Sequence, residues 1–172
     1  MKIIKTKFKG LLVIKSKKFH DNRGVFREIF KQNLIKDKII FNVVSKSKKN
    51  VLRGLHMQEK NPQGKFVSVI QGKILDVMVD CRKTSNTFGK HFKLILSEDN
   101  CKSVYIPPGF LHGFLALSNQ NPVIYGCTKY RDVNSEVGVL WNDKDLKIKW
   151  NIKNPILSDK DNKNIKFKDL NV

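Results

Sequence analysis

Residues 65–106, KFVSVIQGKILDVMVDCRKTSNTFGKHFKLILSEDNCKSVYI, contain four short apolar runs separated by turn-forming residues. The runs lie at 65–70, 73–80, 91–96 and 103–106 and are rich in β-branched and aromatic side chains. Runs of this length, bounded by Gly, Asn, Asp and Ser, are typical of β-strands that follow one another through tight turns. This stretch therefore predicts four consecutive strands with no helix between them.

The same pattern extends to both sides of this stretch. Before it, strands are expected at 10–15 and 25–30, and after it at 122–128, 137–140 and 148–150. About ten short strands with few helical patterns between them are typical of two packed sheets or a closed barrel. The fold class that we expect is therefore all-β, a sandwich or jelly-roll barrel with a few short helices.

Helix is expected in few places. Residues 32–38 could form one short helix, and the polar tail at 158–172 could be helical, loose or docked onto the body. No repeat, low-complexity linker or change in composition divides the chain, and its 172 residues suit one domain. We therefore expect a single domain over residues 1–172.

The chain is strongly basic, with 34 Lys and Arg against 15 Asp and Glu and a formal net charge of +19. A nucleic-acid partner is one explanation for such a balance. However, only five of the basic residues are Arg, the side chain best suited to bidentate recognition of bases and phosphates. Lys, Asn and Ile are all abundant, as AT-rich codons would produce, so the composition does not favour a nucleic-acid-binding protein.

The cysteines and the N-terminal residues indicate where the protein works. Cys81, Cys101 and Cys127 are odd in number and lack metal-binding spacing, which favours buried thiols in a reducing compartment. Lys and Gly interrupt the segment 1–14 before it reaches the apolar length of a signal peptide, and no run approaches a membrane span. We therefore expect a soluble, cytoplasmic protein with no membrane contact.

Two of the four histidines have unusual neighbours. His56 follows the run VLRGL, in which Arg and Gly interrupt apolar residues, and His112 lies in the Pro- and Gly-rich segment 105–114. Either could be a core histidine that bonds to a backbone carbonyl, or a residue of a functional site. His20 and His91 have Lys-rich neighbours and are expected at the surface.

The segment 107–112, PPGFLH, has the P-x-G-x-x-H form of the second motif of the cupins, a jelly-roll superfamily. Many cupins hold iron or manganese with three His and a carboxylate. Their first motif requires His-x-His followed by Glu, whereas Met57 and Gln58 follow His56 here. The sequence therefore predicts no metal and no other cofactor.

Metal-free acid–base chemistry is the alternative. It needs a base that titrates near neutral pH, a carboxylate to orient it, a proton donor and a cation to balance oxyanion charge. His56, Asp161 and Lys65 are residues of the right kinds, with either Tyr125 or Tyr130 as the donor. The spacing alone leaves open whether they meet.

Several segments, taken in order along the chain, resemble the dTDP-4-dehydrorhamnose 3,5-epimerase family, a metal-free group of cupins that act on nucleotide-linked 4-keto sugars. They cover nearly the whole chain, and the combination of RGLH, PxGxxHGF and LSxKD is specific. The matching segments are DNRGVFRE at 21–28, SKSKKNVLRGLHMQ at 45–58, QGK at 63–65, GKILDVMVDCRKTSNTFG at 72–89, residues 106–114, WND at 141–143 and PILSDKD at 155–161.

The resemblance implies a role for each matching residue. His56 corresponds to the catalytic base, Asp161 to its carboxylate partner and Tyr125 to the proton donor on the opposite face. Lys65 and His112 correspond to residues that line the sugar site and stabilise the enolate. The implied contacts to the substrate or its diphosphate are Arg23, Glu28, Arg53, Glu136 and Lys160. Phe26, Tyr130 and Arg131 are further expected substrate contacts.

The resemblance also implies a homodimer, because the family's residues that correspond to Arg23 and Glu28 reach the site of the neighbouring subunit.

The strand expected at 73–80 carries Asp76 and Asp80 on one face and apolar residues on the other. Asp76 is therefore expected to orient His112 from behind, with a solvated carboxylate as the equal alternative.

Two departures from the family concern the nucleotide. Residues 41–44 are FNVV where the dTDP-specific members carry a polar Gln-Asp/Asn-Asn run, and Arg131 stands where those members place a Tyr that stacks on thymine. Arg131 could stack on or bond to another base, so the sequence favours a nucleotide other than dTDP, with GDP first.

The predicted function is an epimerase that inverts carbons 3 and 5 of a GDP- or dTDP-linked 4-keto sugar, a 6-deoxy sugar or a heptose, for surface polysaccharide. A carbon-3-only epimerase and a 3,4-ketoisomerase on the same scaffold are the alternatives within this class. A non-catalytic sugar-nucleotide-binding protein is the alternative from another class, and the complete set of His56, Lys65, Tyr125 and Asp161 argues against it.

Overall fold

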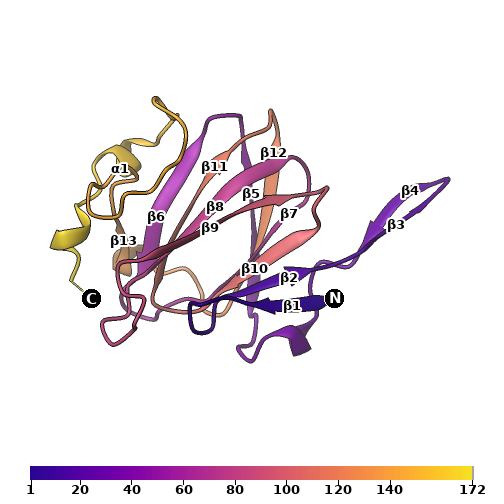
Figure 1. Ribbon diagram of the computed structural model, residues 1–172, viewed down its shortest axis with the longest axis horizontal. Helices are drawn as coiled ribbons and strands as arrows, with labels where there is room; N and C mark the ends of the chain where they lie inside the picture. Colours follow the sequence, from indigo (N-terminus) through magenta and orange to yellow (C-terminus); the bar gives the residue numbers. More distant parts are fainter. Residues whose placement is uncertain (172) are drawn as a thin grey trace.

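A computed structural model describes residues 1–171 and contains two antiparallel sheets that face one another (Figure 1). Val172, the last residue of the predicted tail, lies outside the described residues. The first sheet has the order β1-β2-β10-β7-β12-β5 and the second the order β13-β6-β11-β8-β9. The first comprises β1 (Lys2–Lys5), β2 (Leu12–Lys15), β10 (Lys102–Ile106), β7 (Lys65–Val69), β12 (Asn121–Cys127) and β5 (Phe41–Ser47); the second comprises β13 (Glu136–Gly138), β6 (Leu52–Gln58), β11 (Phe110–Ala116), β8 (Lys73–Asp80) and β9 (His91–Ser97).

This arrangement confirms the all-β, jelly-roll prediction. Helix is confined to short pieces, and the four strands predicted between residues 65 and 106 are present as β7, β8, β9 and β10. The helical pieces are η1 (Gln32–Leu34), η2 (Val133–Ser135), α1 (Asp159–Asn162) and η3 (Phe167–Asp169).

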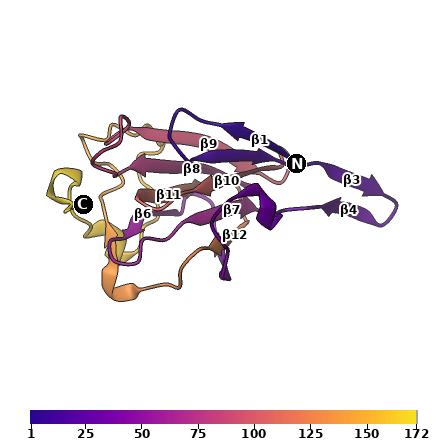
Figure 2. The same ribbon diagram turned by 90° about the horizontal axis from the view of Figure 1, so that it is seen from below.

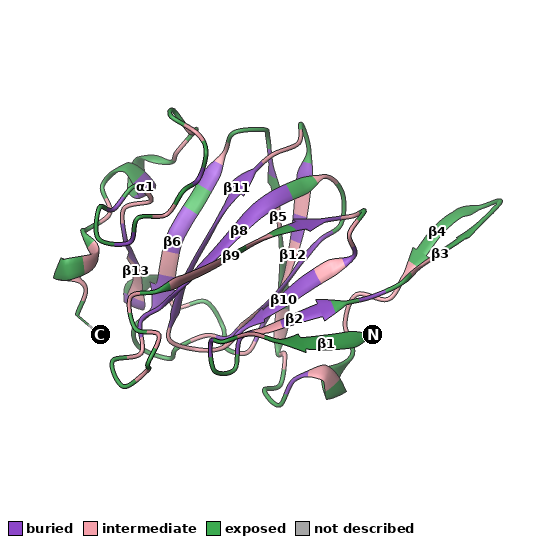
Figure 3. Cartoon of the chain, in the orientation of Figure 1, coloured by how far each residue is buried: buried purple, intermediate pink, exposed green. Residues whose placement is uncertain are grey.

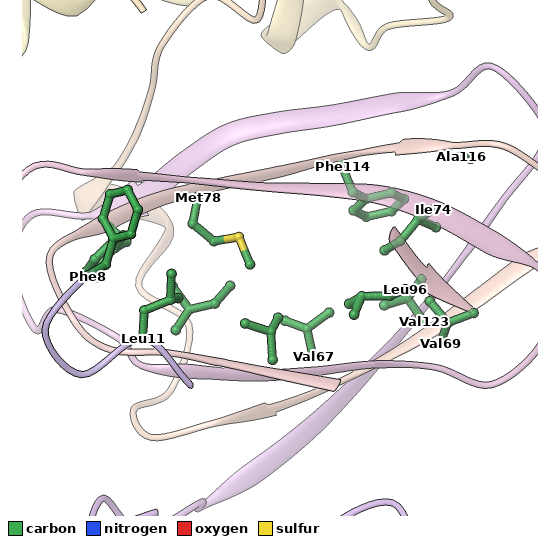
Figure 4. Packing of buried hydrophobic residues seen from close by; sticks show 13 residues of the cluster. Phe8, Leu11, Val67, Val69, Ile74, Met78, Leu96, Phe114, Ala116 and Val123 are labelled. Carbon is green, nitrogen blue, oxygen red and sulfur yellow. The ribbon is translucent and has the colours of Figure 1, made fainter. Parts of the chain in front are cut away.

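The main core lies between the two sheets (Figure 4). Alternate residues of β8 point to opposite sides, since Ile74 and Met78 join this core whereas Leu75, Val77 and Val79 join a second cluster. The second cluster lies on the outer face of its sheet, where the C-terminal segment covers it. The tail is therefore docked, one of the three options that the sequence left open.

The hairpin formed by β3 (Lys18–Asp21) and β4 (Gly24–Arg27) projects from the body, and Figure 2 shows the same projection after a quarter turn. Its residues are mostly exposed (Figure 3). Phe19 and Phe26 are 57% and 65% exposed, which is unusual for aromatic side chains in a strand pair. This pair of strands buries almost none of its own apolar surface.

Two predicted elements are wrong and one is too long. Residues 148–150 form no strand, because Lys147 and Asn151 have positive φ angles and Trp150 is anchored by its indole N–H to the Trp141 carbonyl at 2.7 Å. The helix expected at 32–38 is only the turn η1, and the strand expected at 25–30 ends at Arg27.

Five strands, β1, β3, β5, β6 and β11, were missing from the prediction. Strands β1 and β3 are exposed, and β5 is an edge strand with several polar residues, so all three lack the apolar alternation of a half-buried strand. Strands β6 and β11 each contain a glycine, which usually marks a turn. The structure uses these two glycines for close packing at the site described below.

The three cysteines are free and buried, as the sequence predicts. No helix within residues 1–171 has the length and apolar character needed to span a membrane.

Candidate active site

A cavity of about 410 Å³ lies inside the jelly roll and collects side chains from both sheets and from α1. Nine residues with predicted catalytic or binding roles line it, together with others that the sequence did not single out. The predicted ones among the titratable groups are His56, Lys65, His112, Tyr125, Glu136 and Asp161; the predicted cations at its edge are Arg53, Arg131 and Lys160.

His56 and Asp161 form a close pair although 105 residues separate them in the chain. His56 Nε2 lies 2.5 Å from Asp161 Oδ1. Asp161 is buried on α1, whose first turn is capped by Ser158 Oγ accepting from the Asp161 N–H. Burial alone would raise the pKa of Asp161, but the hydrogen bond and charge of His56 outweigh it and hold that pKa below its usual value. Asp161 is therefore an ionised partner for the imidazole.

The close approach of β6 and β11 brings a second imidazole beside the first. His56 and His112 are directly opposite in the strand register. Gly54 has φ of 104°, and a Cβ on it would lie 2.5 Å from the His112 carbonyl oxygen and 2.7 Å from Gly113 Cα. Only glycine fits at this contact. The G in the RGLH motif is thus explained by packing between the two histidine-bearing strands.

His112 is paired with Asp76, as the sequence analysis expected. His112 Nε2 lies 2.7 Å from Asp76 Oδ1, and both side chains are buried. The solvated alternative for Asp76 is wrong, since its residue is 0% exposed. The other carboxylate oxygen, Asp76 Oδ2, has no hydrogen-bond partner within residues 1–171. The site thus contains two His–Asp pairs, whose histidines lie opposite one another on neighbouring strands of one sheet.

Tyr125 approaches the cavity from the other sheet. It lies on β12, its hydroxyl is 3.0 Å from Ser45 Oγ on β5, and its ring is 6.2 Å from that of His112, centroid to centroid. Burial raises the pKa of Tyr125 well above its usual value, with Asp76 adding to the effect and Ser45 opposing it. The hydroxyl therefore stays protonated at neutral pH, in a cavity that Tyr125 lines together with both histidines.

Lys65 is a part-buried cation on β7, opposite Cys127 in the register. Burial lowers the pKa of Lys65, and the nearby charge of Glu136 and Asp76 opposes the shift. In the described part of the chain its ammonium has no carboxylate within ion-pair distance. An anionic ligand in the cavity would supply the missing counter-charge.

Glu136 holds two cations at the edge of the cavity. Arg131 Nε and Nη2 donate to Glu136 Oε2 at 3.1 and 3.0 Å, and Lys160 Nζ donates to Oε1 at 2.8 Å. Burial alone would raise the pKa of Glu136, but the bonds from Lys160 and Arg131 lower it below its usual value. The cluster gives this edge of the cavity a net positive charge.

Two aromatic rings lie near Arg131. Tyr130 is 69% exposed, and its ring lies 5.5 Å from that of Phe41, which lines the cavity. From their sequence, residues 41–44 were expected to lack the polar nucleotide contacts of the family. In the structure Phe41 instead supplies an aromatic face next to the cavity.

Four residues of the predicted substrate-binding set do not line the cavity: Tyr130, whose ring lies 5.5 Å from that of Phe41, and three residues in or next to the projecting hairpin. Arg23 pairs with Asp21 at 2.6 Å in the projecting hairpin, Phe26 is exposed on the same hairpin, and Glu28 pairs with Lys31 at 2.8 Å. None of them reaches the site of its own chain as described.

The structure adds residues that sequence reasoning missed. Ser45 bonds to Tyr125, Ser158 caps the helix that carries Asp161, and Gln58 is buried two residues after His56. Ser45 and Gln58 lie in the segment that matches the family, which was the available signal. No group of three or more His, Cys, Asp or Glu side chains with metal-binding geometry occurs within residues 1–171.

Known proteins are similar to this chain in sequence and in structure. The family model described as dTDP-4-dehydrorhamnose 3,5-epimerase matches residues 5–169. A dTDP-4-dehydrorhamnose 3,5-epimerase of Shigella flexneri is 42% identical over 176 residues, which cover 98% of this chain and 97% of the relative.

Solved structures agree with this match. A dTDP-6-deoxy-D-glucose-3,5-epimerase of Legionella pneumophila, in complex with dTDP-4-keto-L-rhamnose, superposes with a TM-score of 0.94 at 38% identity and covers 99% of this chain and 94% of its own. A dTDP-4-dehydrorhamnose 3,5-epimerase of Elizabethkingia anophelis gives a TM-score of 0.92 at 39% identity, with 100% and 99% covered.

Proposed function

Since the chain belongs to the dTDP-4-dehydrorhamnose 3,5-epimerase family, we propose that it inverts carbons 3 and 5 of a 4-keto sugar carried on a nucleoside diphosphate. It is an epimerase of the isomerase class. The observation that carries the proposal is that a candidate base, His56, and a candidate acid, Tyr125, line one cavity from opposite sheets. Such an arrangement removes a proton from one face of a sugar ring and returns one to the other.

His56 is the base in this proposal. A ketone at carbon 4 acidifies the protons on carbons 3 and 5, and a neutral imidazole is a suitable base for them. Asp161 is ionised and accepts from Nε2–H, which leaves the Nδ1 lone pair to take the proton. The carboxylate then stabilises the imidazolium that forms.

Two groups stabilise the enolate in the proposal. The Lys65 ammonium supplies positive charge from a part-buried position, where electrostatic interactions are stronger than in water. His112 donates to the enolate oxygen through Nδ1–H when it is protonated, with Asp76 balancing its charge.

Tyr125 completes the inversion. Its hydroxyl donates a proton to the carbon from the face opposite His56, and Ser45 is placed to bond to the resulting phenolate. His56 and Tyr125 return to their starting states by exchange with water before the second carbon reacts. A carbon-3-only epimerase or a 3,4-ketoisomerase would use the same first proton abstraction, so the two carbons must be followed separately.

For the nucleotide, we propose dTDP as the first candidate, because the relatives named above are dTDP-sugar epimerases and Phe41 supplies an aromatic face at the cavity. GDP is the second candidate, and Arg131 is the observation that favours it. A guanidinium can donate two hydrogen bonds to O6 and N7 of guanine, whereas thymine offers no such pair of acceptors. Comparing the dissociation constants of dTDP and GDP separates the two.

The projecting hairpin supports a homodimer as part of the proposal. Exposed Phe19 and Phe26, with Arg23 beside them, lie on a strand pair that has little contact with its own chain. In a dimer these residues would enter the partner's site. Sedimentation at equilibrium should give twice the monomer mass, and a monomer would refute this part.

Deuterium exchange tests the proposed reaction. The protein is incubated in heavy water with dTDP- and GDP-linked 4-keto-6-deoxy sugars and with a GDP-linked 4-keto-heptose, and deuterium at carbons 3 and 5 is counted by NMR. Two exchanged positions support the 3,5-epimerase, and one supports the carbon-3-only enzyme. No exchange with any substrate, combined with tight binding, would favour a non-catalytic sugar-nucleotide-binding protein.

A further inference from the structure

Gln58 is a buried polar side chain that the proposed reaction does not use. It ends β6, two residues after His56, and is 6% exposed. Its Nε2 donates to the backbone carbonyls of Asn61 at 3.0 Å and Tyr130 at 3.4 Å, and its Oε1 accepts from the Asp132 backbone N–H at 3.0 Å. A side-chain amide has two N–H donors and one oxygen, so each group has a partner and the amide has one orientation.

Two of these three bonds bracket one residue of the cavity. Tyr130 and Asp132 are the neighbours of Arg131 on either side, and both are bonded to Gln58 through their backbones. The guanidinium of Arg131 is fixed in turn by Glu136, which is directly opposite Gln58 in the β13–β6 register. Gln58 therefore fixes the position of both members of this ion pair: its side chain holds the backbone around Arg131, and its backbone pairs with that of Glu136.

Other hydrogen bonds also join the loop at residues 59–64 to the loop at residues 128–135, but they do not replace the bonds of Gln58. Ser135 Oγ donates to the Lys60 carbonyl at 3.0 Å, and the Glu59 N–H donates to the Ser135 carbonyl at 3.0 Å. They fix the start of β13, and Ser135 Oγ also contacts the Asp132 carbonyl at 3.4 Å, whereas the Tyr130 carbonyl and the Asp132 N–H have their side-chain partner in Gln58. Removal of this amide would leave residues 130–132 free to shift while the strand stays paired.

We propose that Gln58 is a positioning residue for nucleotide recognition, which holds the Arg131 guanidinium over the cavity by bonding to the backbone on both sides of it. This inference rests on the proposed function and adds that Arg131, which lines the cavity, contacts the bound nucleotide. Because Gln58 and His56 share β6, the same strand then sets the base and the nucleotide contact at a fixed separation.

The test replaces Gln58 with methionine, which keeps the length and volume of the side chain but has no amide. Dissociation constants of dTDP and GDP are measured by calorimetry for the parent, Gln58→Met, Arg131→Met and the double variant. Loss of the bonds that order the loop is expected to weaken binding of the preferred nucleotide about 10-fold. The double variant is expected to bind no more weakly than Arg131→Met alone, because Gln58 acts through Arg131.

Two further measurements distinguish positioning from a general loss of structure. With the 4-keto substrate, Gln58→Met is expected to raise KM and leave kcat near that of the parent, as a loss of uniform binding does. Amide hydrogen exchange is expected to speed up in residues 129–136 and to stay unchanged in β8. Gln32→Met is the matched control, since Gln32 also bridges loop backbone, between Asp37 and Ile39, and lies outside the cavity.

Several results would overturn the inference. The inference is wrong if the parent and Gln58→Met bind nucleotide equally well. It is also wrong if the losses of binding free energy in the two single variants add fully in the double variant, or if Gln58→Met lowers kcat and leaves KM unchanged. If Gln58→Met does not fold, Gln58→Asn serves instead, because its shorter amide cannot reach both carbonyls. A parent that binds nucleotide but exchanges no deuterium would refute the proposed function alone, since the affinity measurements would still decide the role of Gln58.

Discussion

Asp161→Asn is the substitution that tests the His56–Asp161 pair most directly. The carboxylate is 3% exposed and lies 2.5 Å from His56 Nε2, so it orients the imidazole and balances the charge that develops when His56 takes a proton. An asparagine has nearly the same shape and keeps the packing around α1. It loses the negative charge, and its N–H₂ group can bond to Nε2 and so favour the wrong tautomer of the imidazole.

The size of the effect follows from the geometry. Two unit charges about 4 Å apart attract by about 4 kcal/mol at an effective dielectric constant of about 20. The side chain of His56 is 24% exposed, so solvent reduces this value. A loss of about 3 kcal/mol in transition-state stabilisation corresponds to a rate lower by about 100-fold.

The assay is deuterium incorporation at carbon 3 under single-turnover conditions, which isolates proton abstraction from product release. Asp159→Asn is the control, because Asp159 lies on the same helical turn and is exposed. We expect Asp159→Asn to exchange at the parental rate. If Asp161→Asn were within threefold of the parent while its thermal unfolding is unchanged, Asp161 would have no part in activating His56.

Three other substitutions test separate parts of the site and fold. Tyr125→Phe should keep deuterium exchange but lose inversion, because the donor on the opposite face is gone, and NMR of the product distinguishes the two. Arg131→Tyr should move the ratio of GDP to dTDP affinity toward dTDP by about 10-fold, measured by calorimetry, and an unchanged ratio would exclude Arg131 from base recognition. Asp80 has its pKa lowered to about 2: burial opposes the shift, and bonds from Arg82, Ser85 and Thr87 outweigh it. Asp80→Asn should therefore lower the free energy of unfolding by about 2 kcal/mol at pH 7, measured by urea titration. A carboxylate whose pKa is lowered in the folded state stabilises the fold only while it is ionised. The difference between the parent and the variant should therefore persist above about pH 4 and shrink as the pH falls toward 2.

The sequence predicted the strands whose residues alternate or form continuous apolar runs, and it failed where backbone geometry decides the structure. Strand β8 begins and ends where the pattern places it. Strands β6 and β11 were missed because Gly54 and Gly113 resemble turn signals, although they allow the two strands to approach closely. Whether a glycine serves a turn or a contact depends on a partner strand that is distant in sequence, here about 60 residues away.

The candidate site was predictable for residues that match a motif and unpredictable for those that act through the backbone. His56 and Asp161 are 105 positions apart and give no periodic signal, so only the family resemblance connected them, and the 2.5 Å contact is consistent with it. Gln58 shows the opposite case. Its bonds go to backbone groups of Asn61, Tyr130 and Asp132, which any sequence could provide, so no residue type marks its partners.

The net charge of +19 says little about this site, whereas the local balance of charges says more. Four cations line the cavity, namely Arg53, Lys65, Arg131 and Lys160, against the two carboxylates Glu136 and Asp161. Glu136 is shared by two of the cations, and Asp161 belongs to His56. Arg53 and Lys65 therefore face the cavity without a carboxylate partner among residues 1–171. A diphosphate would balance this excess of about two charges, so the affinity for a nucleotide sugar should fall as salt screens the site, whatever the other lysines contribute.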